Sequence, residues 1–234
     1  MTTQAHLARI GDAAAIVGGV ALAIATFLHP MSADPADPVA AFAEYAADRL
    51  WVLSHLGQFF SVAILGVALL ALAVIMEPGR AAAWAWVGAL GATAGVAATA
   101  ALQAVDGVAL KIMVDRWAAA TGEAQARAFE GAFAVRQIEI GLASFVSSLF
   151  GLSVSSFGIS ILADRRFPRW LGYLGLVSGI GSLAAGVAQA HTGFAPVAMT
   201  LSMTASTFLL VWVLGVGIVM RRLGRKLQDA SVTR

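Results

Sequence analysis

Six long runs of apolar residues, separated by short polar segments, dominate the pattern along the chain. A helix needs roughly 20 residues to cross a hydrocarbon core, and each run is about that long. Pro30 and the pair Pro78–Gly79 follow the first two runs, where they end a helix. The pattern predicts an all-α polytopic membrane protein in which residues 1–234 form a single integral membrane domain with a six-transmembrane-helix bundle. The approximate spans are residues 11–29, 51–76, 82–109, 137–162, 170–190 and 196–220.

The first polar segment, residues 30–50, predicts a short helix outside the membrane. Asp37 followed by Pro38 is a favourable N-cap and first-turn pair. We expect an amphipathic helix from Pro38 to Leu50 that lies flat, with Phe42, Tyr45 and Leu50 in the membrane interface.

The second polar segment, residues 110–136, allows two structures. Thr121–Gly122 could cap a helix that starts with Glu123, in which case the third and fourth spans extend beyond the membrane as a helical hairpin. The alternative is a plain loop.

Composition also indicates a membrane location. The 234 residues are 59% hydrophobic and only 12% charged, about half the charged fraction of a typical soluble domain. Little of the chain is left for a soluble domain, so the expected partner of the helices is the lipid bilayer.

The distribution of charge predicts the orientation. An even number of spans puts both termini on one side, and Lys and Arg collect on the cytoplasmic side of short-looped membrane proteins. The terminal side, from Arg9 to Arg234, carries ten cations and four acids, whereas the opposite side carries five cations and nine acids. The sequence predicts a multi-pass protein of the cytoplasmic (inner) membrane with both termini in the cytoplasm. Its basic surplus then reflects topology, and no nucleic acid is expected as a partner.

A cleavable signal peptide is the alternative interpretation of the first run. It would end near Met31–Ser32–Ala33. Met fits poorly at the third position before a cleavage site, so we retain the first run as a span.

Small residues predict how the helices pack. In lipid, helices associate through close contacts at small residues and through hydrogen bonds, because there is no hydrophobic drive between them. Three small-x-x-x-small pairs stand in spans three, four and five, and they predict helix contact faces. The many Ser residues of span four also allow a Ser-lined channel. The pairs are Gly91 with Gly95, Gly151 with Ser155, and Gly175 with Gly179.

The tryptophans mostly fall near the ends of the predicted spans. This placement is typical of the aromatic belt at a membrane interface, and we expect no further role for them. They are Trp51, Trp84, Trp86, Trp117, Trp170 and Trp212.

Three of the four histidines fall on the side opposite the termini. His29 closes the first span, His55 opens the second and His191 closes the fifth, so the topology brings them to one layer near the outer interface. They are candidate cofactor ligands, whereas His6 lies on the other side. Further polar residues of this layer are Gln58, Gln103, Asp106, Glu139 and Gln189.

Imidazoles combined with a carboxylate suit zinc, iron or copper. The candidate ligands of one metal ion are His55, His191 and Asp106, and one non-covalent haem held by His residues is the other candidate cofactor. The absence of Cys excludes thiolate ligands, disulfides and covalently attached haem. Neighbouring polar groups would orient the ligands, namely Gln58, Gln103, Glu139 and Gln189.

Carboxylates within a span need a partner. On insertion scales a charged carboxylate costs roughly 3 kcal/mol at the bilayer centre and less near the interface. Asp106 and Glu139 stand near the ends of their spans, where Lys111 or Arg136 could pair with them. A structural polar network without a ligand is the alternative to a cofactor site.

These observations favour an integral inner-membrane protein that binds a small ligand, a metal ion or haem at the extracytoplasmic ends of its helices. A membrane metalloenzyme or haem electron-transfer protein is one alternative, and a transporter or a structural, partner-binding subunit is another. Whether the chain catalyses a reaction, and its oligomeric state, do not follow from these patterns.

Four stretches carry a resemblance to known sequences. They are residues 28–30 (Leu-His-Pro), 51–58 (Trp-Val-Leu-Ser-His-Leu-Gly-Gln), 106–117 (from Asp-Gly to Trp) and 166–172 (Arg-Phe-Pro-Arg-Trp-Leu-Gly). Together they resemble a bacterial group of uncharacterised six-span membrane proteins that is common in high-GC actinobacteria. The resemblance covers most of the chain and implies no known activity or catalytic residue.

Overall fold

The computed structural model describes residues 3–232, and this part of the chain is helical apart from short connections. Arg234, one of the cations of the terminal side, lies outside the described residues. The elements in chain order are α1 (Thr3–Phe27), α2 (Pro38–Ala47), α3 (Trp51–Ile75), α4 (Arg80–Gln103), the π-helical segment η1 (Ala104–Leu110), α5 (Lys111–Ala119), α6 (Gly122–Ala163), α7 (Arg169–Thr192) and α8 (Pro196–Val232).

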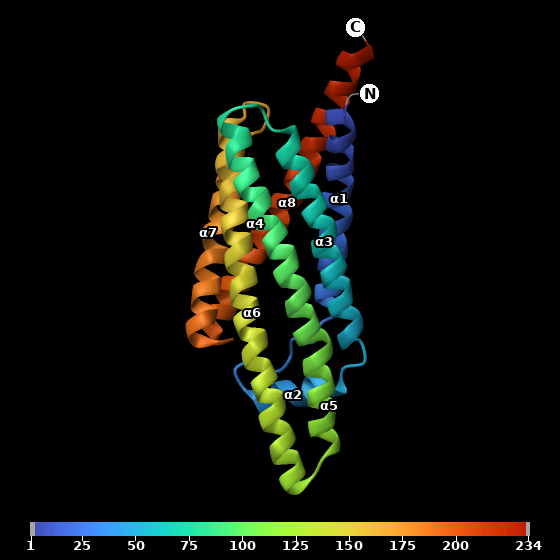
Figure 1. Cartoon of the computed structure of the whole chain (residues 1–234), viewed down its shortest axis with the longest axis vertical. Helices are drawn as coiled ribbons and strands as arrows, with labels where there is room; N and C mark the ends of the chain where they lie inside the picture. Colours follow the sequence, from blue (N-terminus) through green and yellow to red (C-terminus); the bar gives the residue numbers. More distant parts are fainter. Residues whose placement is uncertain (1–2, 233–234) are drawn as a thin grey trace.

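Six stretches of the described chain are helical, long and apolar enough to cross a membrane, which confirms the predicted six-span fold. They are α1, α3, the continuous run of α4, η1 and α5, then α6, α7 and α8. The two ends of the chain lie at the same end of the bundle (Figure 1). We call this the terminal end and the opposite one the distal end.

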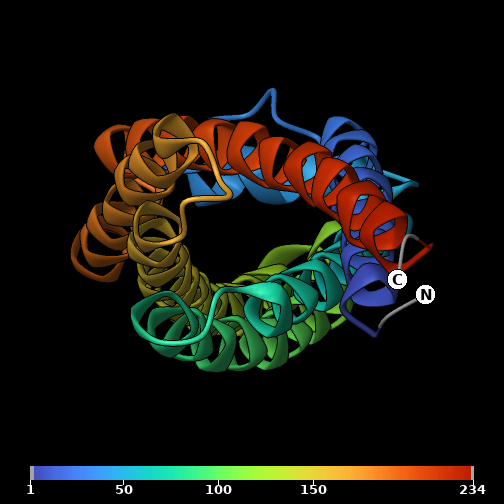
Figure 2. The same cartoon turned by 90° about the horizontal axis from the view of Figure 1, so that it is seen from above.

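The six long helices form a closed ring (Figure 2). Each packs against the next one in the sequence, and α8 returns to pack against α1. An ion pair joins the last helix to the first, since Arg221 Nε of α8 lies 2.9 Å from Asp12 Oδ2 of α1. Because the helices satisfy their own backbone hydrogen bonds, side chains alone decide the character of the interior of the ring.

The interior of the ring contains two apolar clusters, one towards each end, with a layer of buried polar side chains between them. Towards the terminal end, Leu72, Phe157 and Trp212 belong to one apolar cluster that draws on all six long helices. At the distal end, Phe42 and Trp51 belong to a second, aromatic-rich cluster of α2, α3, η1, α5 and α6. Buried polar side chains occupy the helix positions between the two clusters. They include Ser54, His55, Thr99, Arg136, Glu139 and Gln189.

The helix α2 forms where the sequence predicts it, but the expected interfacial position of Phe42 and Tyr45 is wrong, because both are buried in the distal cluster. Asp37 Oδ1 accepts hydrogen bonds from two backbone N–H groups of the first turn and so caps the helix. The helix lies across the bundle axis in Figure 1. It ends at Ala47, short of the predicted Leu50, because the Asp48 carboxylate accepts a hydrogen bond from the Leu50 N–H and the chain turns into α3.

The segment after α4 is a helical hairpin, and the plain-loop alternative is wrong. α5 and the first half of α6 extend beyond the other helices at the distal end (Figure 1). The hairpin packs on α2 and the start of α3, since Leu110, Val114 and Ala132 are fully buried in the distal cluster that these helices share. Gly122 begins α6 with a φ of +59°, a turn that glycine adopts without strain.

Small residues bring neighbouring helices together, as predicted. A Cβ added to Gly179 of α7 would lie 2.3 Å from Ser155 Oγ and 2.6 Å from the Ser155 backbone nitrogen of α6. A serine of α6 also bonds to the neighbouring helix α4, because Ser153 Oγ donates a hydrogen bond to the carbonyl oxygen of Gly88. These contacts show that this part of the Ser-rich span is a packing face.

Two tryptophans depart from the predicted aromatic belt. Trp84, Trp86 and Trp170 are exposed, as a belt requires. Trp51 and Trp212 are 1% and 0% exposed. The expectation that the tryptophans have no further role is wrong for these two, because Trp212 fills the apolar cluster and Trp51 contacts the polar residues described below.

A buried carboxylate closes the terminal end of the ring. Asp164 Oδ2 accepts a hydrogen bond from Arg166 Nη2 at 2.6 Å and one from the Glu77 N–H at 3.0 Å. Burial alone would raise the pKa of Asp164, but these hydrogen bonds outweigh burial and hold the pKa below its ordinary value. The charged group thus joins the loop after α3 to the loop after α6.

We expect the α6–α7 contact to tolerate no added side chain. Gly179→Ala would push a methyl group against the backbone of α6 and lower the free energy of unfolding by about 1–3 kcal/mol. Gly141→Ala on α6 is the matched control, because a Cβ there meets nothing within 4 Å. Thermal unfolding in detergent compares the two variants, and equal midpoints would contradict the close contact of the helices.

Candidate functional site

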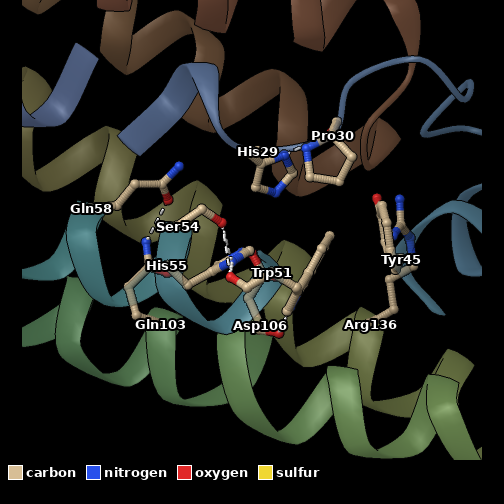
Figure 3. A network of polar contacts seen from close by, with 10 residues as sticks. All are labelled: His29, Pro30, Tyr45, Trp51, Ser54, His55, Gln58, Gln103, Asp106 and Arg136. Carbon is tan, nitrogen blue, oxygen red and sulfur yellow. Dashed lines mark hydrogen bonds and ion pairs between the residues drawn. The ribbon is translucent and has the colours of Figure 1, made fainter. Parts of the chain in front are cut away.

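Three protonatable side chains from separate elements meet at the distal end of the ring (Figure 3). His29 follows α1, His55 lies in the second turn of α3, and Asp106 lies in η1. One ligand atom of each residue lies within 4.8 Å of those of the other two. We call these three residues the His–His–Asp cluster.

Backbone carbonyl groups determine which ring nitrogen of each histidine is free. His55 Nδ1 lies 2.6 Å from the carbonyl oxygen of Trp51, and His29 Nδ1 lies 2.7 Å from that of Pro30. A carbonyl oxygen can only accept, so both Nδ1 atoms carry a hydrogen and donate it. The Nε2 atoms of both rings are therefore left for other partners.

The contact between His55 and Asp106 requires a positive charge. His55 Nε2 lies 3.0 Å from Asp106 Oδ2. Two lone pairs repel each other at this distance, so either a proton or a cation has to lie between them. Burial lowers the pKa of His29, and the nearby His55 lowers it further, which favours the uncharged ring with a free lone pair on Nε2.

Two buried carboxylate oxygens near the cluster have no hydrogen-bond partner among the described residues. They are Asp106 Oδ1 and Glu139 Oε2. Asp106 and Arg136 are the charged groups that act on Glu139, which is 5% exposed. A buried acceptor without a donor costs free energy, and a cation in the cluster would offset that cost.

A change of helix type places Asp106 against α3. The segment η1 is a π-helix, whose turn is wider than that of an α-helix, and such segments often occur at functional sites. Gly107 permits the approach, since a Cβ there would lie 2.5 Å from His55 Cβ. Trp51 Nε1 donates a hydrogen bond to the carbonyl oxygen of Asp106 at 3.0 Å. The indole ring of Trp51 also packs against His55, with ring centroids 4.4 Å apart.

The expected pairing of Asp106 with Lys111 or Arg136 is wrong, because its partner is His55. Lys111 Nζ instead donates to the carbonyl oxygens of Tyr45 and Ala46 at the end of α2. This ammonium group satisfies the last turn of α2 and so fixes the helix over the cluster.

Arg136 is buried beneath α2 and the loop that precedes it. It is 2% exposed, and it donates from Nη1 to the Tyr45 hydroxyl at 3.1 Å and from Nη2 to the Pro35 carbonyl oxygen at 2.7 Å. Its Cζ lies 5.2 to 5.7 Å from the ring centroids of Phe42, Tyr45 and Phe194.

The other predicted residues lie near the cluster or apart from it. Gln103 Nε2 donates to Gln58 Oε1 at 3.1 Å, on α4 and α3 just beyond the cluster. Gln189 Oε1 accepts a hydrogen bond from Ser147 Oγ. His191 is exposed at the end of α7 and is not part of the cluster. Among the three candidate histidines, the structure thus brings His29 and His55 to Asp106.

Sequence reasoning missed three residues that shape the cluster. Trp51 packs against His55, Tyr45 packs against Trp51 with ring centroids 4.2 Å apart, and Gly107 allows η1 to approach His55 closely. The i, i+4 spacing of Trp51 and His55 was a signal that the two rings share a helix face. A glycine next to an acid within an apolar run was a signal of close backbone approach.

The fold and the buried polar residues define this chain as a multi-pass α-helical membrane protein. Residues 9–218 match the family described as a domain of unknown function, DUF4386, and the chain belongs to this family. The match reaches all six membrane-crossing helices. No curated protein and no solved structure matches the chain.

We expect Gly107→Ala to separate η1 from α3. The added methyl group would overlap His55 and lower the free energy of unfolding by about 1–3 kcal/mol. Thermal unfolding checks this against Gly141→Ala, which changes the same residue type in open space. A Gly107→Ala protein as stable as that control would show that the approach of η1 to His55 does not depend on glycine.

Proposed function

We propose that this membrane protein binds one divalent transition-metal ion through His29, His55 and Asp106. The observation that carries the proposal is that both histidines donate Nδ1–H to backbone carbonyls, which leaves each Nε2 available as a ligand atom beside Asp106, and His55 Nε2 already lies 3.0 Å from Asp106 Oδ2. Metal-binding histidines are oriented in this way by their other ring nitrogen.

The donor set suits a particular class of ion. Two imidazoles and one carboxylate are typical ligands of zinc and of iron in open sites, with a further position left for water or a substrate. A tetrahedral ion with bonds of about 2.0–2.2 Å spaces its ligand atoms about 3.3 Å apart. The present spacing, at most 4.8 Å, is reached from that arrangement by small side-chain movements.

The same geometry favours an ion over haem. The ring centroids of His29 and His55 are 4.9 Å apart, and Trp51 packs against both rings. A haem held by two histidines places its macrocycle between the two rings. These rings are already in contact with each other, so a single ion fits the cluster better.

Glu139 supports a second candidate function, that of a membrane metalloenzyme. Its Oε2 is buried without a partner among the described residues, and Asp106 is one of the two charged groups that act on it. A carboxylate beside a metal-bound water can serve as a general base. The role of Glu139 would then be to accept a proton, whereas the three residues of the cluster hold the ion.

We propose further that the cluster faces the outside of the cytoplasmic membrane. The excess of Lys and Arg at the terminal end supports a cytoplasmic location for both termini, and the cluster lies at the distal end. A metal ion would then reach the cluster from the extracytoplasmic side.

Metal analysis of the detergent-purified protein tests the proposal. We expect about one zinc or cobalt ion per chain after loading, and a loss of affinity of at least about 100-fold in His29→Ala, His55→Ala and Asp106→Asn, because each removes a ligand. Visible absorption of bound cobalt gives a readout of ligand geometry that does not depend on any activity.

Three variants are the controls for that experiment. His191→Ala should leave the affinity unchanged, since His191 lies outside the cluster, and His6→Ala alters an exposed residue at the terminal end. Glu139→Gln tests whether Glu139 is a metal ligand or a proton acceptor. The variant should still bind the ion if Glu139 only accepts a proton, and it should lose the ion if Glu139 is a ligand. Stoichiometric binding that survives in the three ligand variants, or a folded wild-type protein that takes up no ion, would refute the metal site.

The absence of Cys makes the orientation directly testable. We expect Ser32→Cys, in the exposed distal loop, to react with a membrane-impermeant maleimide in intact spheroplasts. Pro78→Cys, in the exposed loop at the terminal end, should react only after the membrane is opened. Labelling in the reverse order would place the cluster on the cytoplasmic side.

A further inference from the structure

A surface hollow lies at the distal end, apart from the His–His–Asp cluster. It has a volume of about 420 Å³, and it is bounded by the loop before α2, by α6 and by the turn between α7 and α8. Its polar lining side chains are Arg136, Gln137, Gln189, His191 and Thr192. We call it the Arg136 hollow.

The side chains that line the Arg136 hollow offer hydrogen-bond donors without any acidic group. Arg136, Gln189 and His191 are among its lining residues, and neither Asp nor Glu is. The net character of the hollow is therefore cationic, although the distal side as a whole carries more acids than cations. The charge of this lining suits an anion.

The guanidinium of Arg136 is the strongest of these donors. It is 2% exposed and forms no ion pair with a carboxylate within the described part of the chain, although a buried charge is costly unless it is paired. One neutral hydroxyl and one carbonyl oxygen occupy Nη1 and Nη2, and three aromatic rings lie over Cζ. Nε–H is left without a partner among the described residues, and an oxyanion would complete the group.

Gln189 provides a second oriented donor. It is 4% exposed, and its Oε1 accepts a hydrogen bond from Ser147 Oγ on α6. That hydrogen bond fixes the amide so that its –NH₂ group, which donates to no described residue, is free for a ligand. His191, at the mouth of the hollow, adds a ring that can donate as well.

We propose that the Arg136 hollow binds a phosphate group. The donors are the Arg136 Nε–H and the Gln189 amide, which match the oxygens of a phosphate, and the hollow opens at the distal end of helices that cross a membrane. Two sources carry this chemistry, the headgroup of an anionic phospholipid and a soluble phosphate compound. The site does not depend on the proposed metal ion, because none of the three cluster residues lines the hollow.

Binding of defined phosphates to the purified, intact protein tests the proposal. The probes are phosphatidylglycerol and phosphatidylcholine by native mass spectrometry, and inorganic phosphate and glycerol 3-phosphate by calorimetry. We expect preferential binding of phosphatidylglycerol if a lipid is the source, and competition by glycerol 3-phosphate in either case. Arg136→Gln should lower the affinity by at least about 10-fold, and Gln189→Leu by about 3- to 10-fold.

Matched variants keep the result interpretable. Arg127→Gln removes an exposed cation from the same helix and should leave the affinity unchanged. Arg136 also holds the loop before α2, so Gln189→Leu and His191→Ala carry the test if Arg136→Gln does not fold. His55→Ala should abolish metal binding and leave phosphate binding intact, which separates a failure of this proposal from a failure of the metal site.

Three results would overturn the proposal. One is that neither the phospholipids nor the soluble phosphates bind the folded protein. Another is that phosphatidylglycerol and phosphatidylcholine bind equally and glycerol 3-phosphate displaces neither. The third is that Arg127→Gln weakens binding as much as Gln189→Leu, because binding would then follow from overall charge.

Discussion

The distal half of this protein depends on one constraint, that a buried carboxylate must meet a positive charge. His55 Nε2 and Asp106 Oδ2 meet this constraint at 3.0 Å, across the contact of α3 with η1. For these atoms to meet, η1 has to approach α3 so closely that only glycine fits at position 107. The wider π-helical turn also has to direct Asp106 toward α3. The Trp51 indole then holds η1 in place through the Asp106 carbonyl. The local backbone is thus adapted to the electrostatic requirement of one side chain.

The two polar sites share a wall of aromatic rings. Trp51 packs on His55, and Tyr45 packs on Trp51 with ring centroids 4.4 and 4.2 Å apart. The hydroxyl of Tyr45 in turn accepts a hydrogen bond from Arg136. The rings of Trp51 and Tyr45 therefore link the His–His–Asp cluster to the guanidinium of Arg136. Glu139 interacts electrostatically with a residue of each site, because Asp106 and Arg136 are the charged groups that act on it.

The sequence was sufficient for the architecture because lipid leaves few alternatives. Local sequence rules predict the six spans from the apolar runs, the start of α2 from Asp37, and the helix contacts from the small-residue pairs. The structure has the corresponding helices and contacts. The topology also indicated that His29, His55 and Asp106 lie in one layer. It could not tell that His29 rather than His191 reaches the other two, since that depends on how the ring closes and on rotations of individual helices. Nor could it show that Trp51 is buried, because a tryptophan at a span end has the same pattern whether it faces lipid or a neighbouring helix.

The closed ring also has a consequence for how the protein is made. The helices leave the ribosome in order, and each of the first five contacts can form as soon as the next helix is inserted. The contact of α8 with α1, with the pair of Arg221 and Asp12, joins residues at opposite ends of the chain. Until the last helix arrives, α1 keeps an unpaired flank with a buried acid on it, and α7 has no neighbour on one side. The nascent protein is therefore an open arc for most of its synthesis, and it becomes a ring in the final step.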